Sequence, residues 1–217
     1  VGETKLLVRR DRIEVKVEAN FVMRGTVLPV RRASFTTVAR DQLLADVEIP
    51  VVSLQDMYGG KLCAALDRQH PRDLFDVMQL YGNEGITPGI RRAFVVYLCC
   101  GKRPIHELLF PQLRDIRRDY TNNFQGMTAE PVALEVLVAV RERLVRQIQQ
   151  ELDGSERRFL LSLVRGEPAW SLLGIAHLEH LPGIRWKLRN LDQLKKTNAK
   201  KFAEQVAALA AGFAGIG

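Results

Sequence analysis

The sequence lacks most of the features that would place a chain outside the ordinary globular class. No run of about 18 apolar residues occurs, so we expect no membrane-spanning helix. The N-terminal stretch VGETKLLVRRDRIEVK has no apolar segment, so we expect no signal peptide. Only 3 cysteines occur, and Cys63, Cys99 and Cys100 form no CxxC pair, which is typical of a reducing compartment. We therefore expect a cytoplasmic protein.

Acidic residues are fewer than basic ones. The chain has 32 Lys and Arg against 25 Asp and Glu, which gives a net charge of +7 at pH 7. Hydrophobic residues make up 47% of the chain, which is enough to form a buried core. The basic balance favours polyanionic partners but does not specify one.

Strand patterns are confined to the beginning of the chain. Residues 4–22 predict two strands, because apolar and polar residues alternate in IEVKVEANF with the period of a half-buried strand. The RRDR stretch between the two runs predicts a tight reversal, and hence an antiparallel hairpin. The stretch VEIPVVS, residues 47–53, predicts a third short strand, with Ser53 placed to cap the helix that follows.

The rest of the chain shows helical periodicity punctuated by proline and glycine. We predict helices at about 54–68, 71–81, 87–101, 129–152, 155–165 and 182–212. The predicted fold class is α+β, with a partial antiparallel or mixed sheet within residues 1–82 and a predominantly helical domain at 83–217. Because two or three strands make a small sheet, we expect either that helices cover it or that further strands precede Val1.

The stretch GGKLCAALDRQHPRDLFDVMQLY, residues 59–81, concentrates opposite charges around one His-Pro break. Lys61 and Arg68 lie about two helical turns apart, so they share one face of the first helix. Pro71 predicts the start of a second helix, with an aspartate in its first turn, where the helix dipole favours an anion. We expect five charged side chains to lie close together: Lys61, Arg68, Arg72, Asp73 and Asp76.

Spacing alone leaves two interpretations of this charged cluster open. The cluster could hold a triphosphate and offer a carboxylate to a hydroxyl group or a metal. It could instead be an Arg–Asp network that pins two helices together, because charged faces are usually structural or solvated.

A family resemblance bears on that choice. IEVKVEANFVMRGTV and VEIPVVSLQDMYGGKLCAALDRQHPRDLFDVMQLY resemble the AbiEii/AbiGii nucleotidyltransferase toxins, a branch of the DNA polymerase β-like nucleotidyltransferase fold. RPIHELL, NFQGMTAEPV and RGEPAWSLLG resemble the helical part of the same family, so the resemblance covers nearly the whole chain. It implies that the small sheet is part of a nucleotidyltransferase sheet.

The resemblance also implies roles for the charged cluster. In such enzymes a lysine and arginines hold the nucleoside triphosphate, and these correspond here to Lys61, Arg68 and Arg72. Asp73 corresponds to the candidate catalytic base, and Lys61 would also hold the leaving pyrophosphate. Asp76 would support the site as a partner of Arg72.

The resemblance is incomplete at the metal site. Glu18, in the KVE stretch, corresponds to an acidic residue that assists in binding Mg²⁺ or Mn²⁺, although a polar strand residue is the alternative interpretation. The signature turn of Gly-Gly or Gly-Ser, followed by Asp-x-Asp, does not occur. Gly59 and Gly60 lead into a helix, where we expect them to permit close packing. The chain therefore resembles a family member without its N-terminal portion, and its status as an enzyme stays open.

The function implied by the resemblance is metal-assisted transfer of a nucleotidyl group from a nucleoside triphosphate to an acceptor such as a tRNA 3′ end. The family context implies a type IV toxin–antitoxin or phage-defence role, with a cognate antitoxin as partner. The alternative is a catalytically inactive remnant that binds RNA or another protein.

The C-terminal region contributes a second basic segment. Its side chains could contact an RNA backbone or form a solvated helix face: Arg185, Lys187, Arg189, Lys195, Lys196, Lys200 and Lys201. The small apolar stretch VAALAAGF that follows could dock on its own domain or on a partner.

Other signals in this half of the chain are weaker. Trp170 and Trp186 are interpreted as packing residues, and Cys99 and Cys100 as buried small hydrophobes. His177 and the nearby second histidine in HLEH have no third metal ligand close in sequence, so we expect ordinary surface or capping histidines.

Overall fold

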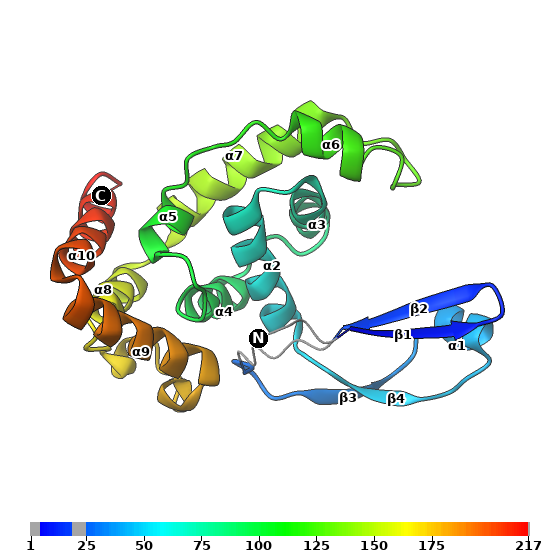
Figure 1. Ribbon diagram of the computed structural model, residues 1–217, viewed down its shortest axis with the longest axis horizontal. Helices are drawn as coiled ribbons and strands as arrows, with labels where there is room; N and C mark the ends of the chain where they lie inside the picture. The colour runs from blue at the N-terminus through cyan, green and yellow to red at the C-terminus, as the bar shows by residue number, and fades with distance from the viewer. Residues whose placement is uncertain (1–4, 19–24, 217) are drawn as a thin grey trace.

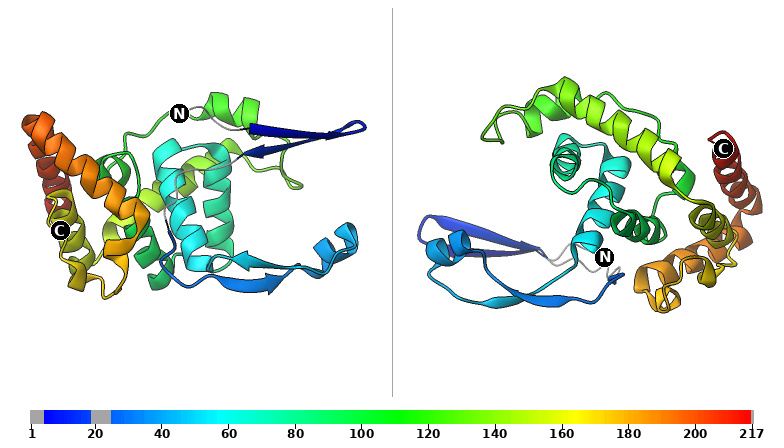
Figure 2. Two further views of the ribbon diagram at one scale, coloured as in Figure 1. Left: turned by 60° about the horizontal axis from the view of Figure 1, so that its bottom comes forward. Right: turned by 180° about the vertical axis from the view of Figure 1, so that it is seen from behind.

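The computed structural model describes residues 5–18 and 25–216. These residues form helices and two small antiparallel sheets, so the predicted α+β class is confirmed. Two strand pairs extend from one end of a helical body, and the C-terminal helices lie at the opposite end (Figure 1). Two further views show the same separation of strands and C-terminal helices (Figure 2).

The first strand pair is the predicted hairpin. Strand β1 (Lys5–Arg10) pairs antiparallel with β2 (Ile13–Glu18), and Asp11 occupies the turn at φ +56°. The apolar side chains of this hairpin are exposed, with Ile13 at 68% and Val15 at 53%. The prediction of a half-buried strand is therefore wrong within the described part of the chain. The alternation reports the geometry of a strand, but it does not report whether another element covers the apolar face.

The second sheet pairs β3 (Arg31–Ser34) with β4 (Glu48–Val51), and helix α1 (Thr37–Leu43) lies in the connection between them. Strand β4 confirms the strand predicted at residues 47–53. Strand β3 was not predicted, because its RRAS sequence has too few apolar residues to show a strand period.

Helices α2 (Leu54–Arg68) and α4 (Pro88–Leu98) pack closely at the centre of the helical body. Their approach depends on Gly59, where an added Cβ would lie 2.9 Å from the carbonyl carbon of Ala93. The predicted close packing is thus confirmed for Gly59 but wrong for Gly60, which faces open space.

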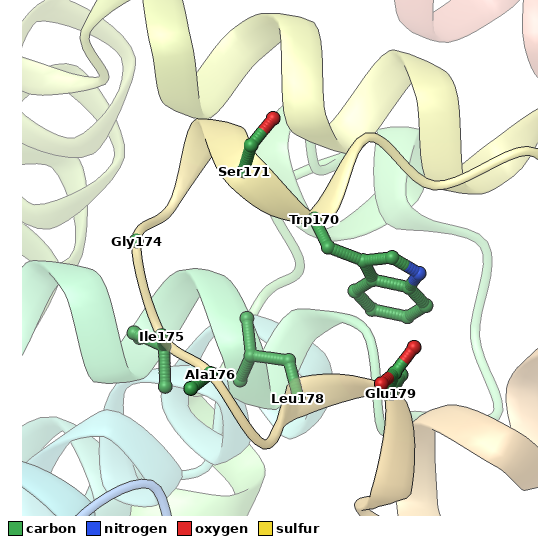
Figure 3. A pocket seen from close by; sticks show the side chains of 7 residues that line it. All are labelled: Trp170, Ser171, Gly174, Ile175, Ala176, Leu178 and Glu179. Carbon is green, nitrogen blue, oxygen red and sulfur yellow. The ribbon is translucent and has the colours of Figure 1, made fainter.

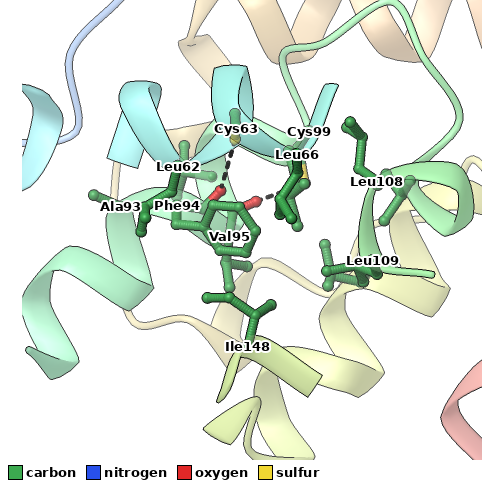
Figure 4. Close-up of a cluster of buried hydrophobic side chains, with 14 of the residues drawn as sticks. Leu62, Cys63, Leu66, Ala93, Phe94, Val95, Cys99, Leu108, Leu109 and Ile148 are labelled. Carbon is green, nitrogen blue, oxygen red and sulfur yellow. Dashed lines mark hydrogen bonds between the residues drawn. The ribbon is translucent and has the colours of Figure 1, made fainter. Parts of the chain in front are cut away.

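The hydrophobic core forms where α2 and α4 meet α5 (Ile105–Leu109) and α7 (Leu134–Glu151). Leu62 and Phe94 are fully buried there, and Ile148 closes the cluster from the α7 side (Figure 4). Side chains from both sides of residue 82 join this one core, and the domain boundary at that position stays a prediction.

The remaining helices form the far end of the body. Their bounds are α6 (Arg117–Asn123), α8 (Gly154–Val164), α9 (Pro182–Thr197) and α10 (Ala199–Ala214), with short 3₁₀ turns η1 (Trp170–Leu172) and η2 (Leu178–His180). The single helix predicted at 182–212 is wrong, because Asn198 leaves the helical conformation with φ −151° and ψ 74° and caps α10.

Helix α10 carries the apolar stretch VAALAAGF and packs on its own chain. The Phe213 ring lies 6.0 Å from the Phe110 ring, and Gly212 provides the room for this contact. Docking on the same chain, one of the two predicted outcomes, is therefore confirmed. None of the described helices is long and apolar enough to cross a membrane.

Candidate functional site

The His-Pro break forms a tight corner between α2 and α3 (Pro71–Gly82), as predicted. Gln69 ends α2 in the left-handed conformation at φ +52°. His70 caps α3, because its Nδ1 accepts a hydrogen bond from the Arg72 backbone N–H at 3.2 Å. The corner holds the charged faces of the two helices side by side.

Two ion pairs join the helices at this corner. Lys61 Nζ donates to Asp76 Oδ2 at 2.5 Å. Arg68 binds both carboxylate oxygens of Asp73, with Nε at 3.0 Å and Nη2 at 2.5 Å. The Arg68 side chain is 63% exposed, whereas that of Asp73 is only 12% exposed. The structure thus contains the interhelical Arg–Asp network that was one of the two interpretations of the spacing. Both cations of this network are partly exposed to solvent.

Arg72 does not join this network. Asp76 was expected beside Arg72, but its ion pair is with Lys61. Arg72 is exposed and forms no ion pair with another described residue. Consecutive helical residues project about 100° apart, so Asp73 can face α2 while its neighbour Arg72 faces solvent. The structure therefore brings four of the five predicted side chains together as pairs and leaves the fifth at the rim.

The buried Gln69 side chain stabilises the corner, although no role was predicted for it from the sequence. It is 4% exposed, and its Oε1 accepts hydrogen bonds from Arg114 N at 3.0 Å and Arg141 Nη1 at 3.1 Å. Its Nε2 donates to the Gln112 carbonyl at 2.8 Å. Arg141 is itself buried, and that burial lowers the pKa of its guanidinium. A lone Gln in a charged stretch gives no sequence signal of burial.

Asp56 is a second buried polar residue, and no role was predicted for it from the sequence. Its carboxylate accepts hydrogen bonds from the N–H groups of Val27, at 2.6 Å, and Leu28, at 3.0 Å. It also accepts from the Tyr97 hydroxyl at 3.0 Å and from Ser53 Oγ at 2.8 Å. Ser53 caps α2 as predicted, and the Ser-x-x-Asp spacing of a capping box was the available signal.

A cleft of about 1150 Å³ opens beside Arg68. It lies between α2, the segment at residues 25–26, the loop after α4 and the start of α9. Arg68, Lys102, Arg103 and Trp186 are among its lining residues. Trp186 is 41% exposed, so the interpretation of this tryptophan as a core residue is wrong.

Lys187, next to Trp186, is only 5% exposed, unlike the other cations predicted for the basic segment. Its Nζ donates to the carbonyl oxygens of Gly101, at 3.0 Å, and Arg103, at 2.8 Å. Burial lowers the pKa of its ammonium. Its predicted place on an RNA-binding surface is therefore wrong, because the side chain instead ties α9 to the loop after α4.

Cys99 and Cys100 lie at the end of α4, and both are buried as predicted. Burial raises the pKa of the Cys99 thiol well above its usual range.

No group of three or more His, Cys, Asp or Glu side chains forms a metal cluster among the described residues. His177 and His180 are exposed, and His177 Nε2 lies 3.4 Å from the Thr26 carbonyl oxygen. Glu18 ends strand β2, but its side chain lies outside the described residues, so its role stays a prediction.

A smaller hollow of about 340 Å³ is lined by residues 170–179 and by none of the charged corner (Figure 3). It is lined by the loop that joins η1 to η2, with the Trp170 indole beside Glu179. The Trp170 ring lies 6.0 Å from that of Phe159, which confirms the packing role predicted for this tryptophan. None of the described residues that line the hollow is a lysine or an arginine, so the charged corner and its cleft remain the candidate site.

A protein-family model described as "Nucleotidyl transferase AbiEii toxin, Type IV TA system" matches residues 3–190. The chain belongs to this family. The AbiEii resemblance seen in the sequence is thereby confirmed, and the matched region includes the charged corner and the cleft. Family membership identifies a nucleotidyl transferase toxin of a type IV toxin–antitoxin system, with a nucleoside triphosphate as substrate and an antitoxin as partner. The comparisons with curated proteins and with solved structures gave no match.

Proposed function

We propose that this AbiEii-family chain transfers a nucleotidyl group from a nucleoside triphosphate to a nucleic-acid acceptor such as tRNA. The observation that carries the proposal is the corner at Gln69. There Lys61 and Arg68 on α2 are held against the carboxylates of α3, and Arg72 stands exposed at the rim.

The ion pairs make the corner ready to exchange one anion for another. The Lys61 side chain is 37% exposed and that of Arg68 is 63% exposed, so the phosphates of a triphosphate can reach both cations. The partly exposed Lys61–Asp76 pair contributes only about 0–1 kcal/mol, so its exchange for a phosphate contact costs little. Release of Arg68 leaves the largely buried Asp73 carboxylate without its cation, so the phosphate contacts of Arg68 have to offset this loss. Arg72 needs no exchange, because it has no ion pair among the described residues.

The exchange would release the catalytic carboxylate. Once Arg68 turns to the phosphates, an oxygen of Asp73 can accept the proton of the acceptor hydroxyl. The hydroxyl oxygen then bonds to the α-phosphorus, and the bond from that phosphorus to pyrophosphate breaks. Lys61 neutralises the leaving pyrophosphate, and Asp76 holds Lys61 in place until the substrate arrives.

Nucleotidyltransferases generally use a divalent metal ion, so Mg²⁺ or Mn²⁺ belongs in any assay of this chain. The described residues do not by themselves fit such a site, because no three of their His, Cys, Asp and Glu side chains lie together. Glu18 stays the metal ligand predicted from the family resemblance. The steps assigned above therefore use only side chains of α2 and α3.

The test is transfer of α-labelled nucleoside triphosphates to total tRNA in the presence of Mg²⁺ or Mn²⁺. A general base typically contributes about 10²–10⁴-fold to the rate, so Asp73→Asn should lower labelling by at least about 100-fold. Lys61→Ala should lower it comparably. The matched controls are Glu142→Gln and Arg146→Ala, which alter an exposed ion pair on α7 and should leave labelling unchanged.

The second candidate function is a non-catalytic module that binds RNA or protein. The observation in its favour is that both candidate site carboxylates serve an interhelical network. Labelling that Lys61→Ala and Asp73→Asn abolish would support the transferase. Absence of labelling from the wild-type chain with every nucleotide would contradict the transferase proposal and favour the binding module.

A further inference from the structure

The cleft beside Arg68 combines cations with one exposed aromatic face. Lys102 is exposed and forms no ion pair in the described part of the chain. Trp186, on α9, also lines the cleft and exposes 41% of its surface. A tryptophan that is neither packed in the core nor needed to cap a helix is free to contact a ligand.

Two sets of interactions hold the loop after α4, which carries Lys102, in place against α2 and α9. Arg103 Nε binds Asp67 Oδ1 at 2.6 Å, which ties the loop after α4 to α2. The buried Lys187 holds the same loop through the carbonyl oxygens of Gly101 and Arg103. Because Lys187 is the neighbour of Trp186, these bonds also fix where α9 presents the indole.

The chemistry of the lining favours a nucleic-acid strand over other ligands. An aromatic face beside a cation is the arrangement that stacks a base and neutralises its phosphate. The volume of about 1150 Å³ exceeds the range of about 300–1000 Å³ typical of small-molecule sites, and it suits a segment of a polymer. The opening is shared with Arg68, whose guanidinium holds Asp73.

We propose that this cleft binds the single-stranded end of a nucleic acid, with one base stacked on Trp186 and a backbone phosphate at Lys102. The strand would then run toward Arg68 and Asp73, and this direction, but not the binding itself, rests on the proposed transferase function. The cleft is thereby assigned as the acceptor site.

The first experiment uses tryptophan fluorescence in the full chain. Trp170→Phe leaves Trp186 as the only tryptophan, since the sequence contains 2. Titration with a short single-stranded RNA should quench the Trp186 emission to saturation, and added salt should weaken the binding. Emission that is unchanged by the RNA would overturn the proposal.

The second experiment measures affinity by anisotropy of the same RNA carrying a dye. Trp186→Leu and Lys102→Ala should each weaken binding, with a loss of about tenfold for the stacking residue, and Trp186→Phe should retain most of the affinity. The matched control is Arg146→Ala, an exposed cation on α7 that does not line the cleft. Equal losses from Lys102→Ala and Arg146→Ala, with none from Trp186→Leu, would show diffuse binding and overturn the assignment.

These assays need no nucleoside triphosphate, so they separate the two proposals. RNA quenching without any nucleotidyl transfer would support the cleft as a nucleic-acid site and contradict the transferase. Transfer that survives Trp186→Leu with unchanged KM for the RNA would contradict the acceptor site alone. Quenching by a purified antitoxin but not by RNA would assign the cleft to a protein partner and overturn the proposal.

Discussion

Replacement of Asp56 by alanine should be among the most destabilising single changes in this protein. The carboxylate is 3% exposed and accepts hydrogen bonds from two backbone N–H groups and two hydroxyl groups. The Asp56→Ala variant leaves the N–H groups of Val27 and Leu28 and the hydroxyl of Tyr97 without this acceptor. Ser53 Oγ can rotate toward other partners, so it adds little to the loss.

The magnitude follows from these bonds. A hydrogen bond to a charged group contributes about 1.5–3 kcal/mol, and a carboxylate near a helix N-terminus adds about 0.3–1 kcal/mol. Contributions that share one carboxylate are not additive, so we expect Asp56→Ala to lower the free energy of unfolding by about 3–5 kcal/mol. Asp56→Asn keeps one acceptor oxygen and should cost less. Tyr97→Phe removes a single donor and should cost about 1 kcal/mol.

Urea unfolding followed by circular dichroism measures each of these free energies, provided that the slope of the transition is unchanged. Asp41→Ala, at an exposed position on α1, is the control and should stay within about 0.5 kcal/mol of the wild type. A loss below about 1 kcal/mol for Asp56→Ala would contradict this prediction, because it would mean that water replaces the carboxylate as hydrogen-bond acceptor.

Three further predictions concern packing and pH. Gly59→Ala should lower the free energy of unfolding by about 1–3 kcal/mol, because its Cβ would lie 2.9 Å from the α4 backbone. Gly60→Ala, at a position that faces open space, should be neutral or stabilising by up to about 1 kcal/mol. Thermal unfolding of both variants checks this prediction, and equal effects of the two substitutions would contradict it. Desolvation raises the pKa of Tyr81 from 10.0 to about 12, so the folded state keeps this proton longer and stability should fall as pH rises through that window. Tyr81→Phe should remove that fall in urea unfolding at alkaline pH, and an unchanged slope would show that other groups cause it. Burial lowers the pKa of Lys187 below 10.5, so the unfolded state binds more protons in the window just below 10.5, and stability should rise with pH there. Lys187→Met should flatten that rise, and a rise that persists in the variant would contradict the assignment.

The elements that carry the site could be predicted from sequence because their signals are local. Ser53 and Pro71 mark helix starts through the backbone groups that they satisfy or lack, and both positions agree with the structure. The Lys, Arg and Asp positions in residues 59–81 likewise fix which side chains share a helix face. That information sufficed to predict a charged corner.

The pairing within that corner could not be predicted in the same way. Lys61 pairs with Asp76 because the left-handed turn at Gln69 sets the angle between α2 and α3. That turn is held by Arg141, which comes from a helix far along the chain. A contact between distant segments leaves no periodic pattern, so local spacing is compatible with several pairings.

The fold class, the helix starts, the family and the composition of the charged corner follow from residue types and short spacings, so they could be predicted without the structure. The tertiary structure decided which charges pair and which stay buried. It also showed that Lys187 is a structural residue and that Trp186 faces a cleft. Trp186 and Lys187 differ in exposure because consecutive residues of a helix project about 100° apart. The packing of α9 on the loop after α4 determines which of the two side chains is covered.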